Sequence, residues 1–455
     1  MDRCVLVLLV LLPDIIEGCS RRASYPLRQN GTGGCYSKEC CSIAKSFQTT
    51  MDLSVDPCED FYQFVCGGYT ENKAVYETLD SDSEISFNLA SAYNDAMNTV
   101  YSIFSNSSKE KSLLRRARWT FRLCMRKNGT ISSDYSHCYN VTKSHFNYLL
   151  GAVYARNDHQ EQNQEKIKKV QDMLNEVRFS YATIVNQSRW MDETIKERFA
   201  ESAAKITDVI GYEPIVLDNL ADDEELKKAF NPLSSDPVFS KERNAIFVPL
   251  LMMNPPVLNR GLGLKAFDYG AMGVILGQLI AQSYVSFNIK NSGHHLTKPK
   301  SRETISLFEF HRRKNCYANQ YAEEFINLIN LMEIDSFPIY DKPTLDADFA
   351  ENCGLQAAFH AFQRIKDQSK NIQLEGFENF SQEKLFFLSF AKMMCSNEIM
   401  DISKTSRILK LKKGFSPSKL RVNLPLRNMR AFAQTWQCPL GSTMNPGDSS
   451  ICVMW

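Results

Sequence analysis

The chain has 455 residues, 44% hydrophobic and 23% charged, so it holds enough apolar material for a sizeable core and is neither disordered nor collagen-like in composition. Its 53 Lys and Arg against 52 Asp and Glu give a formal net charge of +1, which leaves no basic excess for a nucleic-acid partner. Its 14 cysteines exceed what a reduced cytosolic chain usually carries and favour an oxidising compartment.

The amino terminus carries a short apolar run over residues 4–12 that ends at a proline. This run is about half of the roughly 20 residues that a membrane-spanning helix needs, so residues 1–20 are predicted to be a signal peptide. A polar, Gly-rich tail follows over residues 21–34. The alternative is an uncleaved type II signal-anchor in the plasma membrane, because Ile15 and Ile16 extend the apolar stretch; membrane association is expected only in that case.

N-glycosylation acceptor triplets recur downstream of this segment. A single N-x-S/T triplet is weak evidence, but a set of them behind a signal peptide predicts a glycosylated, secreted or extracellular protein with oxidised cysteines. The six acceptors are Asn30, Asn106, Asn128, Asn140, Asn186 and Asn379.

The first half of the chain alternates Cys-rich and helical patterns. A Cys-rich, aromatic-rich opening begins at Cys35, and a loop that carries two acceptor triplets is expected around Cys124 and Cys138. Over residues 165–211 apolar residues recur at three- and four-residue spacing with Lys and Glu between them, which predicts a long amphipathic helix pair.

The second half of the chain is predicted to contain one short strand and several helices. Residues 246–251 predict an edge strand, because Pro249 cannot donate to a central ladder. Residues 271–284 are apolar with small residues and predict a buried helix. Further helices are expected at 317–332, 355–370 and 382–395. The fold class is therefore mainly α with a small β component.

Five blocks, in order, carry a resemblance to a known family. Residues 51–68, MDLSVDPCEDFYQFVCGG, resemble the start of the ectodomain in the neprilysin family of zinc metallopeptidases. Residues 438–446 with the final Cys-Val-Met-Trp are similar to that family's carboxyl end. The blocks between them are 190–192 with 210–212, 254–256, and 385–391. The resemblance covers most of the chain from Cys35 onward.

The resemblance implies a neprilysin-like, thermolysin-type lobe from which the roofing helical lobe is largely deleted. Family ectodomains are longer, and the missing stretch falls between about residues 140 and 165. The implied division is an N-terminal remnant of the peptidase family over 35–160 and a C-terminal, degenerate metallopeptidase lobe over 161–455.

The resemblance also implies most of the disulfides. By similarity the pairs are Cys35 with Cys40, Cys58 with Cys438, Cys66 with Cys395, and Cys316 with Cys452. The usual partner of Cys124 is absent, and Cys138 is the predicted substitute. Cys41 and Cys353 are left over, and either is a candidate free thiol.

The metal-binding motifs of the family are altered. A zinc peptidase needs two histidines one helical turn apart, a glutamate as general base and a third ligand, written in this family as H-E-x-x-H and E-N-x-x-D. The aligned segments here are 278–282, QLIAQ, and 347–351, ADFAE. The resemblance thus places Gln278, Gln282 and Ala347 at the ligand positions and Leu279 at the base position.

A further position agrees with this loss. Phe415 stands before Ser416-Pro417, where the family has the histidine that stabilises the transition state. None of the seven histidines lies four residues from another, so a helical zinc pair is not available elsewhere. We expect no bound cofactor, although zinc is the family's metal, and no peptidase activity. Gln278 and Gln282 are expected to hydrogen-bond across the former metal cavity.

Some substrate-binding positions persist. Arg421 matches the family's arginine that bonds the substrate carbonyl, with an ion pair as its alternative role. The Asn-Ala pair that holds the substrate backbone falls at Asp236-Pro237. An apolar set lies where the family has its side-chain pocket, with ordinary core packing as the alternative: Val274, Ile275, Met393 and Met394.

The sequence therefore predicts a secreted, neprilysin-like pseudopeptidase that binds peptides or a secreted protein partner. The peptide would add as an extended strand beside residues 246–253. One alternative is an active zinc metalloendopeptidase with an atypical site, and another is a structural or assembly partner of an active relative.

Overall fold

The computed structural model describes 15 stretches of the chain, and all that follows concerns these. The predicted signal peptide and the acceptors Asn30, Asn106 and Asn128 lie outside them. The described residues are 34–35, 38–71, 96, 112–127, 134–156, 160–218, 223–259, 264–285, 302–332, 344–366, 373–374, 376–396, 399–403, 406–409 and 414–455.

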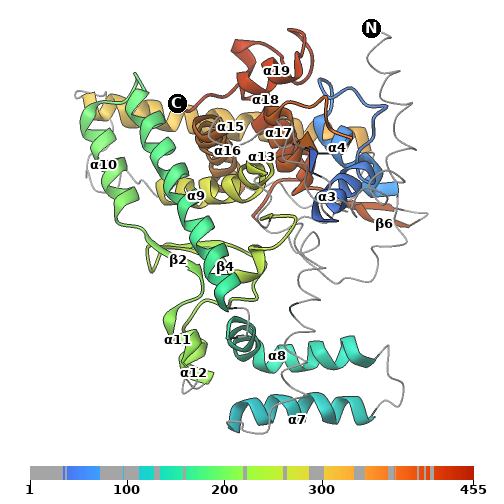
Figure 1. Cartoon of the computed structure of the whole chain (residues 1–455). Helices are drawn as coiled ribbons and strands as arrows, with labels where there is room; N and C mark the ends of the chain where they lie inside the picture. Colours follow the sequence, from blue (N-terminus) through green and yellow to red (C-terminus); the bar gives the residue numbers. More distant parts are fainter. Residues whose placement is uncertain are drawn as a thin grey trace. The chain divides into compact units, whose positions relative to one another are not determined.

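The fold is mostly helical with little sheet, as predicted (Figure 1). By internal contacts the chain forms two compact units that alternate along the sequence. The first comprises the described parts of Met1–Glu84, Met173–Lys205 and Pro256–Trp455, and the second those of Ile85–Asp172 and Ile206–Pro255. The predicted deletion of the roofing lobe and the predicted division at residue 160 stay predictions.

The first unit holds most of the helices, and two-residue strands β1 (Gly34–Cys35) and β5 (Gln373–Leu374) pair in parallel beside them. Strands β6 (Ile399–Ser403) and β7 (Ser406–Leu409) form a hairpin. The helices are α3 (Lys38–Gln48), α4 (Phe61–Glu71), α10 (Glu193–Ala204), α13 (Lys265–Asp268), the π-helical turn η3 (Tyr269–Gly273), α14 (Val274–Val285), α15 (Arg302–Met332), α16 (Leu345–Ile365), α17 (Gln382–Lys392), α18 (Ser418–Arg427) and α19 (Arg430–Trp436).

The second unit contains a three-stranded sheet and a helical hairpin. The sheet has the order β2-β4-β3, with β2 (Thr207–Gly211) parallel and β3 (Val238–Ser240) antiparallel to β4 (Ala245–Pro249). The helices are α7 (Ser112–Lys127), α8 (Asp134–Ala155), α11 (Pro214–Leu217) and α12 (Asp223–Leu226), with the 3-10 turn η2 at Leu250–Met252. Helix α9 (Gln160–Gln187) continues from this unit into the first.

The edge-strand prediction for residues 246–251 is wrong, because β4 is the central strand of its sheet. Pro249 is its last residue and pairs with Gly211 of β2, whereas β3 pairs only as far as Phe247. The proline therefore lies beyond the antiparallel ladder and interrupts no hydrogen bond to β3. All five residues of β4 are buried, which is the burial of a central strand.

The other element predictions agree with the structure, with shifted ends. The pair expected over 165–211 is α9 and α10, except that its last five residues form β2. The predicted apolar stripe of α9 is buried, with Val170, Leu174 and Val177 fully covered. In α10 the Asp192 carboxylate caps the helix by accepting from the Ile195 N–H at 3.0 Å. The helices expected at 271–284, 317–332, 355–370 and 382–395 are α14, α15, α16 and α17.

The prediction of a loop around Cys124 and Cys138 is wrong, because both cysteines lie in helices. Cys124 lies in α7 and Cys138 in α8, and the two helices pack side by side (Figure 1). The predicted disulfide between them is present. The sequence signal of a loop came from the acceptor triplets; Asn140 is in fact a residue of α8. The acceptors Asn186 and Asn379 are exposed.

The three long-range disulfides that the resemblance implied are all formed. Cys58 bonds Cys438, Cys66 bonds Cys395 and Cys316 bonds Cys452, closing separations of 380, 329 and 136 residues. Cys40 is disulfide-bonded, while the side chain of its predicted partner Cys35 is outside the described set. Of the two leftover cysteines, Cys41 is disulfide-bonded and Cys353 is a buried free thiol.

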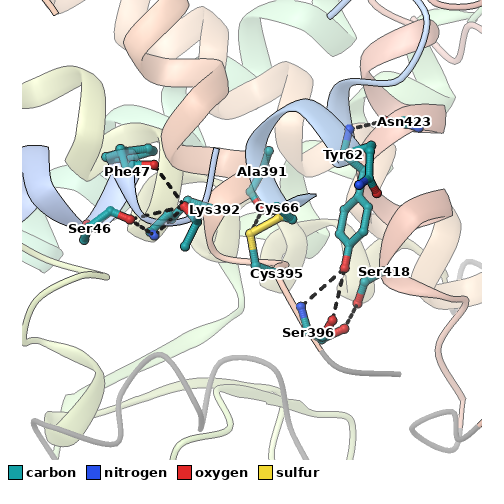
Figure 2. Close-up of a disulfide and its surroundings, with 12 residues drawn as sticks. Ser46, Phe47, Tyr62, Cys66, Ala391, Lys392, Cys395, Ser396, Ser418 and Asn423 are labelled. Atoms are coloured by element: carbon teal, nitrogen blue, oxygen red, sulfur yellow. Dashed lines mark hydrogen bonds between the residues drawn. A yellow bond between two sulfur atoms is a disulfide. The ribbon is translucent and has the colours of Figure 1, made fainter. Parts of the chain in front are cut away.

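The Cys58–Cys438 and Cys66–Cys395 bonds fasten α4 and the residues before it to the C-terminal part of the chain, and Figure 2 shows the second of them. Beside the Cys66–Cys395 bond, the Tyr62 N–H donates to Asn423 Oδ1 at 2.8 Å, and the Tyr62 hydroxyl lies 3.3 Å from Ser396 O. The Phe61 ring packs edge-on against Phe432 and Trp436 at centroid distances of 4.9 and 5.1 Å. Residues near the two ends of the sequence thus share one core.

Helix α3 is fastened nearby through Lys392 of α17 (Figure 2). The Lys392 amine donates to Ser46 O at 2.6 Å and to Thr50 Oγ1 at 2.9 Å, which satisfies acceptors at the carboxyl end of α3. Burial lowers the pKa of Lys392 to about 7.

No helix in the described part of the chain is long and apolar enough to cross a membrane.

Helices α14 and α16 cross at a contact between two glycines. A Cβ on Gly277 would overlap the backbone of Gly354, and a Cβ on Gly354 would overlap the backbone of Gly277 and Gln278. Just before α14, a Cβ on Gly270 would overlap the carbonyl of Phe386 in α17. The absence of side chains therefore lets three helices approach to backbone contact.

We expect Gly354→Ala to lower the free energy of unfolding by about 1–3 kcal/mol, because two helix backbones must separate to admit one methyl group. The measurement is urea unfolding of the full chain. Gly273→Ala is the matched control, since its Cβ would meet only the Tyr269 side chain, at 3.2 Å, and alanine favours the helix. Equal costs for the two variants would contradict the crossing argument.

Candidate functional site

The positions aligned with the family's metal ligands lie on the two helices that cross at this glycine contact. Gln278 and Gln282 are one turn apart on α14, and Ala347 is in the first turn of α16. All three are half-buried, whereas Leu279 at the base position is fully buried. Spacing and helix pairing thus match what the family's motifs require, although the residue types differ.

The donors at these positions do not fit zinc. Zinc in proteins prefers imidazole, thiolate and carboxylate ligands, but two neutral amides and a methyl group stand here. The Gln278 Nε2 atom is buried without a hydrogen-bond partner, so the expected bond across the cavity is not made by this atom. Across the described stretches, no group of three or more His, Cys, Asp or Glu is arranged to hold a metal ion.

Beside these positions lies a buried ion pair. The Arg421 guanidinium of α18 donates to Glu351 of α16 through Nε at 2.7 Å and Nη2 at 2.6 Å from Oε1. The two side chains are only 7% and 3% exposed. Of the two roles considered for Arg421, the structure has the ion pair. Its partner is the residue that the resemblance places at the end of the second zinc motif.

Asp348 adds a second carboxyl group to this cluster. It is 1% exposed, and burial followed by the nearby Glu351 charge raises its pKa to about 8. The nearby Ser416 and Thr344 side chains and the charge of Arg421 oppose the rise. At neutral pH Asp348 is therefore protonated and uncharged, and the only charges that remain in this cluster are those of the Arg421–Glu351 pair.

Phe415 occupies the position of the family's transition-state histidine. Its ring centroid is 4.7 Å from Cζ of Arg421, so it covers the guanidinium by a cation–π contact. It is half-buried and has no group that titrates or donates a hydrogen bond. The residues after it begin α18, where the Arg421 N–H donates to Pro417 O at 3.0 Å.

The four residues of the predicted side-chain pocket are closely packed. Val274, Ile275, Met393 and Met394 are each 2–3% exposed, so they are core residues of the first unit in this structure. The strand that was expected to edge the groove belongs to the second unit, where Asp236-Pro237 directly precedes the outer strand β3. The peptide-groove hypothesis stays a prediction.

Sequence reasoning missed Asp348 and the pairing of Glu351 with Arg421. The partners are 70 residues apart, so spacing carries no signal for the pair. A signal for Asp348 did exist, because the family motif has asparagine there and an acid next to a buried motif is costly unless it is protonated or paired.

The fold and the crossed helices define the class of an M13-type peptidase lobe. Sequence profiles described as peptidase family M13 match residues 237–452 and, for the N-terminal part of the family, 127–213. The chain therefore belongs to peptidase family M13, the neprilysin family, which confirms the resemblance read from the sequence.

The chain spans less than half the length of the curated relatives it matches. An endothelin-converting enzyme homolog from Locusta migratoria is 26% identical over 360 residues, covering 70% of this chain and 46% of the relative. Neprilysin-3 from Drosophila melanogaster is 26% identical over 361 residues, covering 70% and 43%.

Two solved structures share the fold at 14% sequence identity. The zinc metalloprotease Zmp1 of Mycobacterium tuberculosis aligns with a TM-score of 0.51 over 72% of this chain and 52% of that chain. A chain of the Haemonchus galactose-containing glycoprotein complex aligns with a TM-score of 0.62 over 92% of this chain and 99% of that chain.

We expect Arg421→Met to destabilise the chain by about 3–5 kcal/mol, because it leaves Glu351 buried without its counter-charge. Chemical unfolding measures this, and adding Glu351→Met is expected to restore much of the loss. Arg430→Met is the matched control: its pair with Asp448 is exposed, at 68% and 75%, and is worth less than about 1 kcal/mol. The expectation fails if both arginine variants lose the same stability.

We expect Asp348→Asn to stabilise the chain at neutral pH by about 1–4 kcal/mol. The folded carboxyl group has its pKa raised from 3.8 to about 8, so it binds a proton that the unfolded chain has released. Its stabilising contribution is complete below pH 4 and is lost as the pH rises towards 8. The asparagine variant should lose this slope in thermal melts between pH 4 and 8. Asp346→Asn, at an exposed position on the same helix, should keep it.

Proposed function

We propose that this member of family M13 is a secreted, non-catalytic glycoprotein that binds a secreted protein partner. One observation carries the proposal: the zinc-motif positions of the crossed helices hold two amides and an alanine, and the adjacent Arg421 is engaged by Glu351. A metallopeptidase needs a metal to activate water and a base to accept its proton. Leu279, at the base position, cannot accept one.

The proposal of a protein partner, in preference to a short peptide, is supported by packing. The four candidate pocket residues are at most 3% exposed, and Arg421 would have to leave a buried carboxylate to bond a peptide carbonyl. Breaking such a pair is expensive. The fold neighbour from Haemonchus, which this chain matches over 99% of its length, is described as part of a glycoprotein complex. Assembly with other proteins is therefore a function compatible with this fold.

Secretion is supported by the covalent structure. Disulfides such as Cys58–Cys438 and Cys66–Cys395 persist in oxidising compartments and are rare in the cytosol. The acceptors Asn186 and Asn379 are exposed, as glycosylation requires.

We expect the purified, glycosylated protein to contain far less than one zinc ion per chain and to cleave no peptide in a chelator-sensitive manner. Elemental analysis and a peptide-library digest measure both. The matched comparison is a variant that combines Gln278→His, Leu279→Glu, Gln282→His and Ala347→Glu, which restores the family's donors on the same helices and should raise the zinc content. Stoichiometric zinc in the natural chain, with cleavage that a chelator abolishes, would overturn the proposal.

A second experiment looks for the partner: the tagged chain is cross-linked in the secreted fluid in which the protein occurs, and the cross-linked species are identified. A defined heteromeric species is the expected product. Retention of short peptides alone would favour the peptide-groove alternative.

A further inference from the structure

Helix α7 carries an exposed basic stripe that plays no part in the proposed function. Its 16 residues, SLLRRARWTFRLCMRK, include six Lys or Arg and no acidic residue. Over residues 112–156, which include α7 and α8, eight Lys or Arg stand against one Asp, a formal charge of +7, whereas the whole chain is only +1. This segment therefore has a strong net positive charge, and the rest of the chain is net negative.

The exposed side chains form one line along the helix. Arg115, Trp119, Arg122 and Arg126 recur at spacings of four, three and four residues, so they lie on one face, and Arg116 borders it. All five are exposed, and Trp119 is 67% exposed although tryptophan is usually covered. At a rise of 1.5 Å per residue the line is about 16 Å long.

The opposite side of α7 is held by the protein. Ala117 is fully buried, and Cys124 is bonded to Cys138 of α8, which packs alongside (Figure 1). The disulfide and the packing fix the rotation of α7 about its axis, so the stripe is presented in a constant direction. The helix that carries the cations is therefore ordered before binding, and only its side chains lose entropy when they bind a ligand.

We propose that this stripe is a binding site for a sulfated linear polysaccharide. Guanidinium groups form paired, charge-assisted hydrogen bonds to the oxygens of oxyanions, and a line of them matches a linear polyanion better than a compact anion. The flat, exposed face of Trp119 between Arg115 and Arg122 suits contact with the apolar face of a sugar ring.

An anionic membrane is a poorer match for this face. Amphipathic helices that bind membranes insert a broad apolar face with several Trp, Phe or Leu side chains. Among the α7 side chains that the structure describes, Trp119 is the single exposed apolar one. The rest of the exposed face is charged, so electrostatic attraction dominates and affinity should fall steeply with salt.

The test measures binding of the full glycosylated chain to immobilised heparin at about 0.15 M salt and over a salt series. We expect the variant that combines Arg116→Gln, Arg122→Gln and Arg126→Gln to bind at least tenfold more weakly and with a shallower salt dependence, because three charges no longer displace counterions. Arg115 is left in place, since it also interacts within the protein. Trp119→Ala should weaken binding several-fold without changing the salt dependence.

The control removes the same charge elsewhere, by combining Lys168→Gln, Arg189→Gln and Lys241→Gln at exposed, scattered positions. It should bind heparin as the natural chain does. Two results overturn the proposal: equal loss in both triple variants, which indicates a diffuse charge effect, or binding of the natural chain to anionic vesicles but not to heparin, which indicates a membrane surface. Circular dichroism and retention of the Cys124–Cys138 bond confirm that the variants are folded.

Discussion

The described first unit depends on the fastening of α4 to the C-terminal helices. Cys58 and Cys66 flank the start of α4 and bond cysteines 380 and 329 residues away, and between them Phe61 enters the core formed with Phe432 and Trp436. Such cross-links reduce the conformational entropy of the unfolded chain, by an amount that grows with loop length. They also fix α17, which ends at Lys392, shortly before Cys395.

Helix α17, the segment before α14, α14 itself and α16 are joined by backbone contacts at glycines. Gly270 lies against the carbonyl of Phe386 in α17, and Gly277, two turns further along, lies against Gly354 of α16. Close contacts of this kind have little freedom to adjust, because no side chain can change rotamer to absorb a shift. The Gln278 and Ala347 positions therefore lie on two helices whose approach is set by glycine contacts. Glycine contacts of this kind do not depend on the residue types at the motif positions, which is compatible with the non-catalytic role that we propose.

Much of this fold could be predicted from the sequence, because helices and covalent bonds have local or family-specific signals. The apolar stripe of α9 had a local signal in its periodicity, and the long-range cysteine pairs followed from the resemblance to the family. The failures have physical reasons. Pro249 indicated an edge strand, but it lies at the end of β4, beyond the residues that pair with β3, and interrupts no hydrogen bond to that strand. The ion pair of Arg421 with Glu351 joins two helices through tertiary packing, so no spacing in the sequence reveals it. The stripe on α7 was not predicted, because the spacing of its arginines does not tell an exposed face from a buried one, and the exposure of Trp119 does.

The buried cluster is the physical reason why we propose that the region aligned with the family's catalytic site is structural in this chain. An arginine that binds a substrate must exchange water for substrate at low cost, and that requires a partly exposed guanidinium. Here Arg421 is held by Glu351, covered by Phe415 and close to a second carboxyl group that keeps its proton at neutral pH. Each of these contacts lowers the energy of the closed arrangement and raises the cost of turning Arg421 outward. The proposed binding functions therefore belong on surfaces outside this cluster, where side chains such as Trp119 and its neighbouring arginines are already exposed to solvent.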